Sequence, residues 1–207
     1  IPFKEIMNAA GLPPKQGLYD PYYEHDACGV GFIAHLKGKK SHGIVRSGLQ
    51  ILENLEHRGA CGCDPLTGDG AGILIQMPDK FLRREAAKLH IELPKEGEYG
   101  VGLVFLPTRQ HEKNTIESWL EEIVHEEGQR FLGWREVPHD SGQIGHIAHS
   151  AEPEFRQIFI GRGKDVRDEL EFERKLYVIR RRIELKVSGS NLGQRDFFYV
   201  CSLSART

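Results

Sequence analysis

The sequence lacks the excess of positive charge that phosphate backbones and anionic lipid surfaces require. It has 28 Lys and Arg residues against 30 Asp and Glu residues, which gives a formal net charge of -2 at pH 7. It also lacks any apolar run that approaches the roughly 20 residues of a membrane span. These absences predict that the chain binds neither nucleic acid nor a membrane.

Cysteine is scarce as well. The sequence has 4 cysteines, too few and too irregularly spaced for a disulfide framework in a chain of this length. The first segment, residues 1–27, has no continuous apolar stretch of the kind that a secretion signal needs. We therefore expect a chain of the reducing cytoplasm in which residues 1–27 form a propeptide. A hydrophobic content of 39% is enough to bury a genuine core in the remainder.

The residue with the most informative chemistry is Cys28, which lies in the segment EHDACGVGF (24–32) directly after that leader. If the bond between Ala27 and Cys28 is cut, a thiol and a free α-amine share one residue. Such an amine has an ordinary pKa of about 7.7–8.0 and can exchange a proton near neutral pH. The other interpretation is that Cys28 is a small buried hydrophobic residue at the head of a strand. On the first interpretation, removal of the leader switches on a nucleophile that carries its own base.

Several segments, in order through most of the chain, resemble one family. They are GLYDP (17–21), EHDACGVG (24–31), LEHRGA (55–60), DPLTGDGAG (64–72) and FERKLYVIR (172–180). The junction at Cys28 resembles the precursor-to-mature junction of class II glutamine amidotransferases, whose nucleophile is the N-terminal residue. Taken together, the segments resemble the large subunit of glutamate synthase.

The resemblance implies a fold, a reaction and partners. It implies an N-terminal-nucleophile αββα sandwich that hydrolyses L-glutamine to glutamate and ammonia. In the family, the ammonia reaches 2-oxoglutarate at a separate FMN site, and an iron–sulfur cluster and a small reductase subunit or another electron donor serve the downstream synthase domains. The residues that hold FMN and the iron–sulfur cluster in the family have no match here. We therefore expect this segment itself to need no cofactor.

The expected chemistry is covalent. The Cys28 thiolate attacks the carboxamide carbon of glutamine, and the α-amine protonates the leaving ammonia and then activates the water that hydrolyses the thioester. Gly29 either leaves room for the substrate or allows tight strand packing. By resemblance, Arg58 braces the Cys28 loop or holds the substrate carboxylate. A plain cation at the end of a helix explains Arg58 nearly as well.

Two other patterns point to chemistry that we reject. The spacing Gly29-x-Gly31-x-x-Ala34 formally matches a dinucleotide fingerprint, but no apolar strand precedes it and no helix opens after it. Cys61 and Cys63 lie near a histidine, but they lack the second pair of ligands that a zinc site needs. We expect no metal site.

The first part of the nucleophile domain is expected at residues 28–97. A buried strand is predicted at 30–36, a helix capped by Ser41 from 41 to 57, a second strand at 71–77 and a helix at 78–90. Residues 98–207 follow the order β-α-β-β-α-β of a split βαβ unit. Its strands are predicted at 101–106, 131–137, 157–160 and 197–203, and its helices at 115–127 and 170–185. The predicted fold class is therefore α/β (α+β), an incomplete αββα sandwich with a ferredoxin-like lobe. At the end of residues 98–207 we expect the chain to begin to re-enter the sandwich.

Two pieces of the family's active site have no match in the sequence. These are the Asn-Gly pair of the oxyanion hole and the Arg that holds the glutamine carboxylate, and we expect both to lie beyond Thr207. Losing one oxyanion donor typically costs on the order of 10²–10³ in rate, so the 207-residue chain should be almost inactive alone. The alternative function is a noncatalytic binding or scaffold fragment that uses the ferredoxin-like lobe. The N-terminal residue of the purified protein distinguishes the two, because Cys28 at the terminus favours the enzyme.

Overall fold

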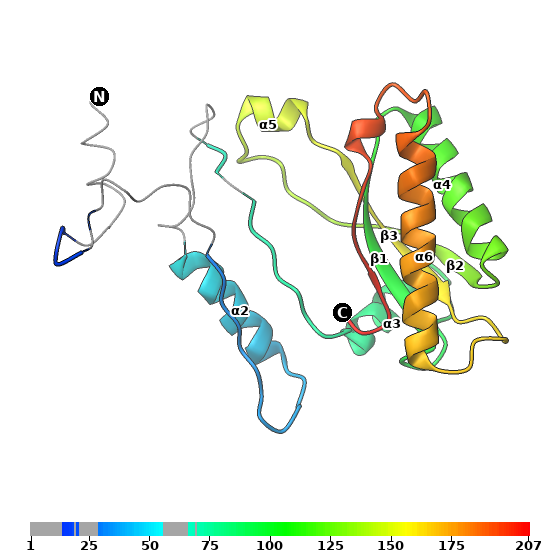
Figure 1. Cartoon of the computed structure of the whole chain (residues 1–207), viewed down its shortest axis with the longest axis horizontal. Helices are drawn as coiled ribbons and strands as arrows, with labels where there is room; N and C mark the ends of the chain where they lie inside the picture. The colour runs from blue at the N-terminus through cyan, green and yellow to red at the C-terminus, as the bar shows by residue number, and fades with distance from the viewer. Residues whose placement is uncertain (1–13, 19, 21–28, 56–65, 69) are drawn as a thin grey trace. The chain divides into compact units, whose positions relative to one another are not determined.

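The computed structural model describes residues 14–18, 20, 29–55, 66–68 and 70–207 (Figure 1). The chain forms two compact units, which we describe separately. The first unit comprises Ile1–Leu74 with Gln143–His149, and the second comprises Ile75–Gly142 with Ser150–Thr207. Among the described residues, no helix is long and apolar enough to cross a membrane.

A four-stranded antiparallel sheet forms the centre of the second unit. Its strands are β1 (Tyr99–Leu106), β2 (Arg130–Glu136), β3 (Glu154–Gly161) and β4 (Tyr199–Ser204). Their order in the sheet is β2-β3-β1-β4, and every neighbouring pair is antiparallel. The two central strands are therefore β3 and β1, whose apolar sequences are the most buried in the sheet.

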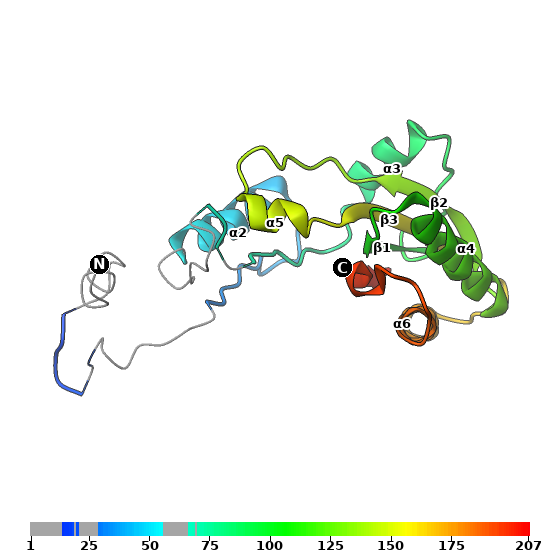
Figure 2. The same cartoon turned by 90° about the horizontal axis from the view of Figure 1, so that it is seen from above.

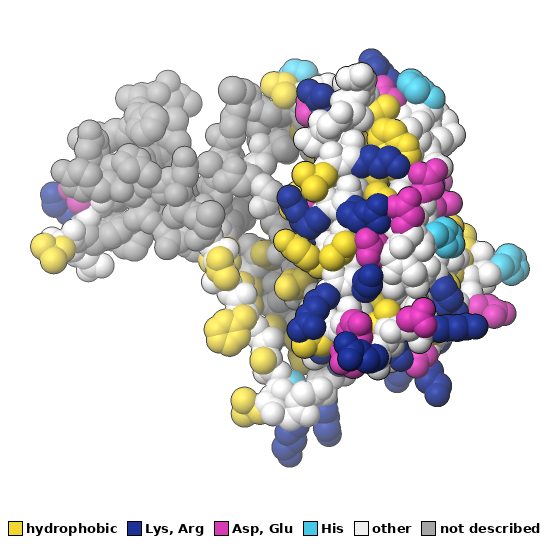
Figure 3. All heavy atoms as spheres, turned by 45° about the vertical axis from the view of Figure 1, so that its right-hand side comes forward, with side chains coloured by type: hydrophobic (Ala, Val, Ile, Leu, Met, Phe, Trp, Pro, Cys, Tyr) yellow, Lys and Arg dark blue, Asp and Glu magenta, His cyan; other side chains and the backbone are white. Residues whose placement is uncertain are grey.

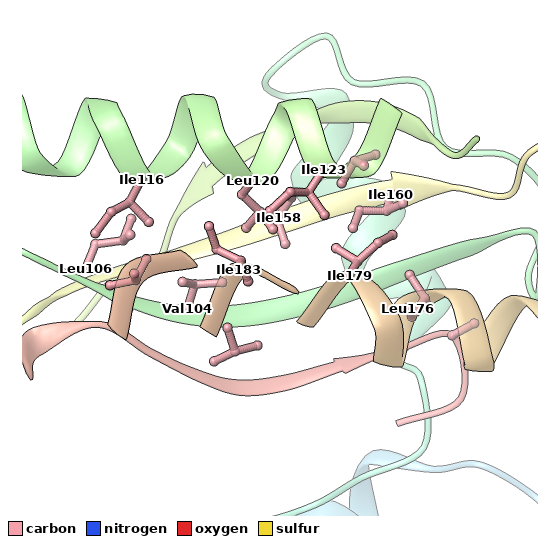
Figure 4. Packing of buried hydrophobic residues seen from close by; sticks show 14 of the residues in the cluster. Val104, Leu106, Ile116, Leu120, Ile123, Ile158, Ile160, Leu176, Ile179 and Ile183 are labelled. Carbon is pink, nitrogen blue, oxygen red and sulfur yellow. The ribbon is translucent and has the colours of Figure 1, made fainter. Parts of the chain in front are cut away.

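Two long helices, α4 (Gln110–Glu126) and α6 (Glu169–Ser188), cover one face of this sheet. Asp168 begins α6 because its carboxylate accepts a hydrogen bond from the backbone N–H of Glu171 at 2.8 Å. Helical spacing then brings the apolar residues of α6 to one side, where they interlock with those of α4 and the sheet (Figure 4). The labelled core residues are Val104, Leu106, Ile116, Leu120, Ile123, Ile158, Ile160, Leu176, Ile179 and Ile183.

Helix α6 approaches β1 closely because β1 has no side chain at Gly100. A Cβ atom at Gly100 would lie 2.6 Å from Leu176 Cδ1, closer than two carbon atoms can pack. The glycine therefore sets the spacing between the helix and the sheet.

Helix α3 (Asp79–Ala87) lies on the other face of the sheet from α6 (Figure 2). The Tyr99 hydroxyl donates a 2.8 Å hydrogen bond to the carboxylate of Asp79, which also accepts one from Arg83. Burial, followed by this bond to Asp79, raises the pKa of the Tyr99 phenol. Arg83 also donates to the carbonyl of Leu93 at 2.8 Å. These polar contacts attach α3 to β1 and to the segment that leads into it.

The first unit contains α2 (His42–Asn54), which begins after Ser41 as expected. The two buried strands predicted at 30–36 and 71–77 are wrong. Both segments are without strand pairing, and large side chains in them are exposed: Val30 is 90% exposed and Phe32 is 91% exposed. The physical reason is that a strand needs a neighbour's backbone groups along its length. The backbone N–H of Met77 donates to the carbonyl of Arg206 at 2.7 Å, but no ladder of such bonds extends along either described segment.

Short helix α5 (His146–Ser150) was not anticipated, and α4 begins five residues before the predicted start at 115. The remaining predicted elements of the second unit are confirmed, with shifts at their ends. Terminal residues of helices and strands are the part that sequence patterns locate least well.

The core of the second unit predicts a contrast between two adjacent residues of α6. Ile179 is fully buried, whereas Val178 is 38% exposed. Ile179→Ala should lower the free energy of unfolding by about 2–5 kcal/mol because it leaves a cavity. Val178→Ala should cost less than about 1 kcal/mol. Urea denaturation followed by circular dichroism measures both, and equal losses would contradict the packing described above.

Candidate active site

The residues with the most direct expected roles lie outside the described part of the chain. These are Ala27 and Cys28 at the processing junction and Arg58 after α2. The same holds for Cys61 and Cys63. The described part of the site is therefore its surroundings: the segment from Gly29, helix α2, and residues 66–68 and 70–74.

The segment that follows Cys28 runs against α2. A Cβ atom at Gly29 would lie 3.0 Å from both methyl carbons of Leu55. A Cβ atom at Gly31 would collide with the side chain of Ile51. Both glycines thus permit close packing on one side of α2, which is the structural alternative considered for them above. The segment that begins at Gly29 consequently makes apolar contact with a helix.

Helix α2 also contacts the segment that leads out of the DPLTGDGAG loop. A Cβ atom at Gly48 would lie 2.8 Å from Ile73 Cδ1, so Ile73 packs directly on the helix backbone. The helix has no fully buried residue. Gly48, Ile51 and Leu55 share one side of the helix at helical spacing, so residues 29–31 and Ile73 contact that same side.

Sequence reasoning missed one contact in this unit. The backbone N–H of Gly145 donates a 2.9 Å hydrogen bond to Oγ1 of Thr67. This bond joins the DPLTGDGAG loop to residues 143–149, which are far away in the sequence but belong to the same compact unit. No local sequence pattern predicts this contact, because the two residues are 78 positions apart in the sequence.

One charge pair in the second unit joins a helix to the sheet through half-buried side chains. Arg156 on β3 donates a 2.6 Å hydrogen bond to the carboxylate of Glu117 on α4, and its guanidinium lies over the ring of Trp134. Burial raises the pKa of Glu117, and the charge of Arg156 opposes that effect. The pair connects helix α4 to strand β3. Within the described ranges, no group of three or more His, Cys, Asp or Glu side chains is placed to hold a metal ion.

Comparison with known families adds a decisive observation. Residues 28–207 match the family model of the class-II glutamine amidotransferases. The chain belongs to this family. The resemblance inferred from the sequence segments is thereby confirmed, and the family match begins at Cys28 itself.

Curated relatives of this class-II amidotransferase are glutamate synthases. The chain is 49% identical over 198 residues to the glutamate synthase [NADPH] large chain of Bacillus subtilis, covering 95% of this chain and 12% of that protein. It is 39% identical to the glutamate synthase [NADH] of Schizosaccharomyces pombe, covering 96% of this chain and 9% of that one. It is 36% identical to the ferredoxin-dependent glutamate synthase 1 of Arabidopsis thaliana, covering 99% of this chain and 12% of that protein. The chain therefore spans about one tenth of the length of these relatives.

Proposed function

We propose that this chain is the glutamine-hydrolysing part of a glutamate synthase and that Cys28 is its nucleophile. The observation that carries the proposal is the start of the family match at Cys28, the residue that removal of the leader would place at the N-terminus. The 49% identity to a glutamate synthase large chain supports the assignment of the downstream reaction.

In the proposed reaction the thiolate of Cys28 adds to the carboxamide carbon of L-glutamine. The C–N bond then breaks, ammonia leaves with a proton from the α-amine, and a thioester remains on the sulfur. The amine next takes a proton from water, which attacks the thioester and releases glutamate and the thiolate. Arg58 is proposed to brace the loop or hold the substrate carboxylate, and Gly29 to support the nucleophile through its packing on α2.

The finer assignment of the fold belongs to the same proposal. We assign the first unit, with residues up to about 97, to the N-terminal-nucleophile sandwich, and residues 98–207 to a ferredoxin-like lobe. The sheet order β2-β3-β1-β4, with α4 and α6 on one face, supports the lobe, because it is the order of a split βαβ unit.

Partners and cofactors are proposed for the whole enzyme. FMN in a downstream domain would supply the reduction that turns 2-oxoglutarate and ammonia into glutamate, together with an iron–sulfur cluster. The names of the relatives specify NADPH, NADH and ferredoxin, so the electron donor, with or without a small reductase subunit, differs within the family. We also propose a reducing compartment such as the cytoplasm, because Cys201 is an exposed free thiol.

A glutamine analogue that carries a thiol-reactive group in place of its amide tests the proposal on the complete, processed enzyme. We expect one label per chain on Cys28, found by mass spectrometry of peptides, and slower labelling when L-glutamine is present. Cys201 is exposed and serves as the internal control, since glutamine should not protect it from a simple alkylating reagent. Labelling of Cys28 at a rate that glutamine does not change would contradict a role in substrate binding.

A further inference from the structure

Helix α6 has a second apolar stripe that is exposed in the part of the chain that the structure describes. Its buried side holds Phe172, Leu176, Ile179 and Ile183. On the opposite side, at helical spacing, lie exposed residues that we call the outer face of α6. They are Leu170, Arg174, Tyr177, Val178, Arg181 and Leu185. Leu170 is 51% exposed, Tyr177 63% and Leu185 65%, so several large apolar side chains share this one face.

The structure gives most residues of the segment 172–180 a role within the second unit. Glu173 accepts hydrogen bonds from the Ser204 hydroxyl and from the backbone N–H of Ala205. Lys175 donates to Glu127 of α4 at 2.9 Å. By contrast, Arg174 has no hydrogen bond or ion pair within the described part of the chain.

The charge on the outer face of α6 is positive only. Carboxylates lie at its two edges: Glu171 pairs with Arg167, and Glu184 is shared by Arg180 and by the second cation of the face, Arg181. One carboxylate between two guanidinium groups leaves a net positive charge beside Tyr177 and Val178. The face therefore combines apolar side chains with two cations seven residues apart, a rise of roughly 10 Å along the helix.

We propose that the outer face of α6 binds a protein segment that carries an apolar ridge flanked by carboxylates. The spacing of Arg174 and Arg181 suits acidic residues that lie two helical turns apart, so the simplest partner is a helix with Glu or Asp at positions i and i+7. In the space-filling view, hydrophobic side chains lie between Lys and Arg side chains on the visible face of the second unit (Figure 3).

A second copy of this chain does not fit the same face. A two-fold axis between Tyr177 and Val178 would place Arg174 of one copy opposite Arg181 of the other. A parallel pairing would place Arg174 opposite itself. Like charges oppose each other in both arrangements, which disfavours association.

A lipid surface fits less well than an acidic protein. Recognition of anionic lipid typically takes clusters of about 4–8 Lys and Arg residues. The other cations on the neighbouring flank of α6 are already paired with carboxylates on α4 and at its C-terminal end. Lys175 pairs with Glu127, Arg182 with Glu126 and Glu127, and Lys186 with Glu122. The positive charge left for a partner is that of Arg174 and of the Arg180–Arg181 pair over Glu184.

The test uses the 207-residue chain and two synthetic helical peptides with the same Leu ridge. One peptide carries Glu at two flanking positions seven residues apart, and the other carries Lys there. We expect the Glu peptide to bind and to perturb the NMR signals of α6 around Tyr177, and the Lys peptide to bind more weakly. Reversing both charges, with Arg174→Glu and Arg181→Glu together, should weaken binding of the Glu peptide about tenfold and strengthen that of the Lys peptide.

Lys80→Glu is the matched control, because Lys80 is an exposed cation on α3, which lies on the other face of the sheet. It should leave binding of both peptides unchanged. The substituted side chains are exposed, so every variant should remain folded, although Arg181→Glu places a like charge beside Glu184 and should lower the melting temperature slightly; circular dichroism measures both. Equal binding of both peptides, stronger binding to phosphatidylserine vesicles than to the Glu peptide, or self-association lost on Tyr177→Ser would each overturn the proposal.

Discussion

Replacing Cys28 with Ser in the complete, processed enzyme is expected to abolish glutamine-dependent glutamate formation while leaving the use of free ammonia largely intact. The reason is that Cys28 alone combines the nucleophile with the terminal amine, and a hydroxyl is a far poorer nucleophile than a thiolate at neutral pH. The loss should be on the order of 10³-fold or more with glutamine. Steady-state rates with glutamine and with ammonium as alternative nitrogen donors measure it.

Cys201→Ser is the control for this substitution. Cys201 is an exposed thiol on β4, outside the proposed chemistry, so its loss should change neither activity. Retention of glutamine hydrolysis by the Cys28→Ser enzyme would remove Cys28 from the mechanism. Equal loss of both activities would indicate damage to the fold in place of loss of a nucleophile.

Blocking removal of the leader is expected to produce a folded enzyme that does not hydrolyse glutamine. While Ala27 is attached, the nitrogen of Cys28 is an amide and cannot act as a base, although the thiol is present. General acid–base catalysis typically contributes about 10²–10⁴ in rate, so glutaminase activity should fall by that factor or more. Ammonia-dependent activity should persist, because it does not use the amine of Cys28.

Intact-mass measurement and a glutaminase assay on the same sample decide this prediction. The sample with the leader should show the mass of the precursor and background activity. The processed sample serves as the positive control. A species that still carries Ala27 and turns over glutamine at the processed rate would show that the α-amine is not the base.

The candidate site could be inferred almost entirely from sequence. Cys28 and its neighbours form a short contiguous segment, and the family segments supply the chemistry without any tertiary contact. The structure adds the packing of the segment that follows Cys28: Gly29 lies against Leu55, the residue after α2, and Gly31 lies against Ile51 of α2. The roles proposed for Cys28 and Arg58 remain predictions of the sequence.

Helix α4 shows what local patterns leave out. Its first turn is polar, so apolar spacing predicts a later start, yet Glu112 is almost fully buried there. Glu112 accepts hydrogen bonds from the backbone N–H of Gln194 at 2.8 Å and from Arg109, and these bonds lower the pKa of its carboxyl. Lys113 pairs with Glu154. Arg109 is a local partner at the start of the helix, but Gln194 and Glu154 lie far away in the sequence, so no window of sequence around this turn reveals them.

The sequence by itself determined the family, the candidate nucleophile and most elements of the second unit. These depend on contiguous residues or on periodic apolar spacing, as in α6, whose buried side follows the spacing of Leu176, Ile179 and Ile183. Tertiary structure alone decided the bond between Gly145 and Thr67 and the failure of 30–36 and 71–77 to form strands. The reason is that pairing and burial are properties of two segments at once, and an apolar run specifies what a segment can bury but not which neighbour it meets.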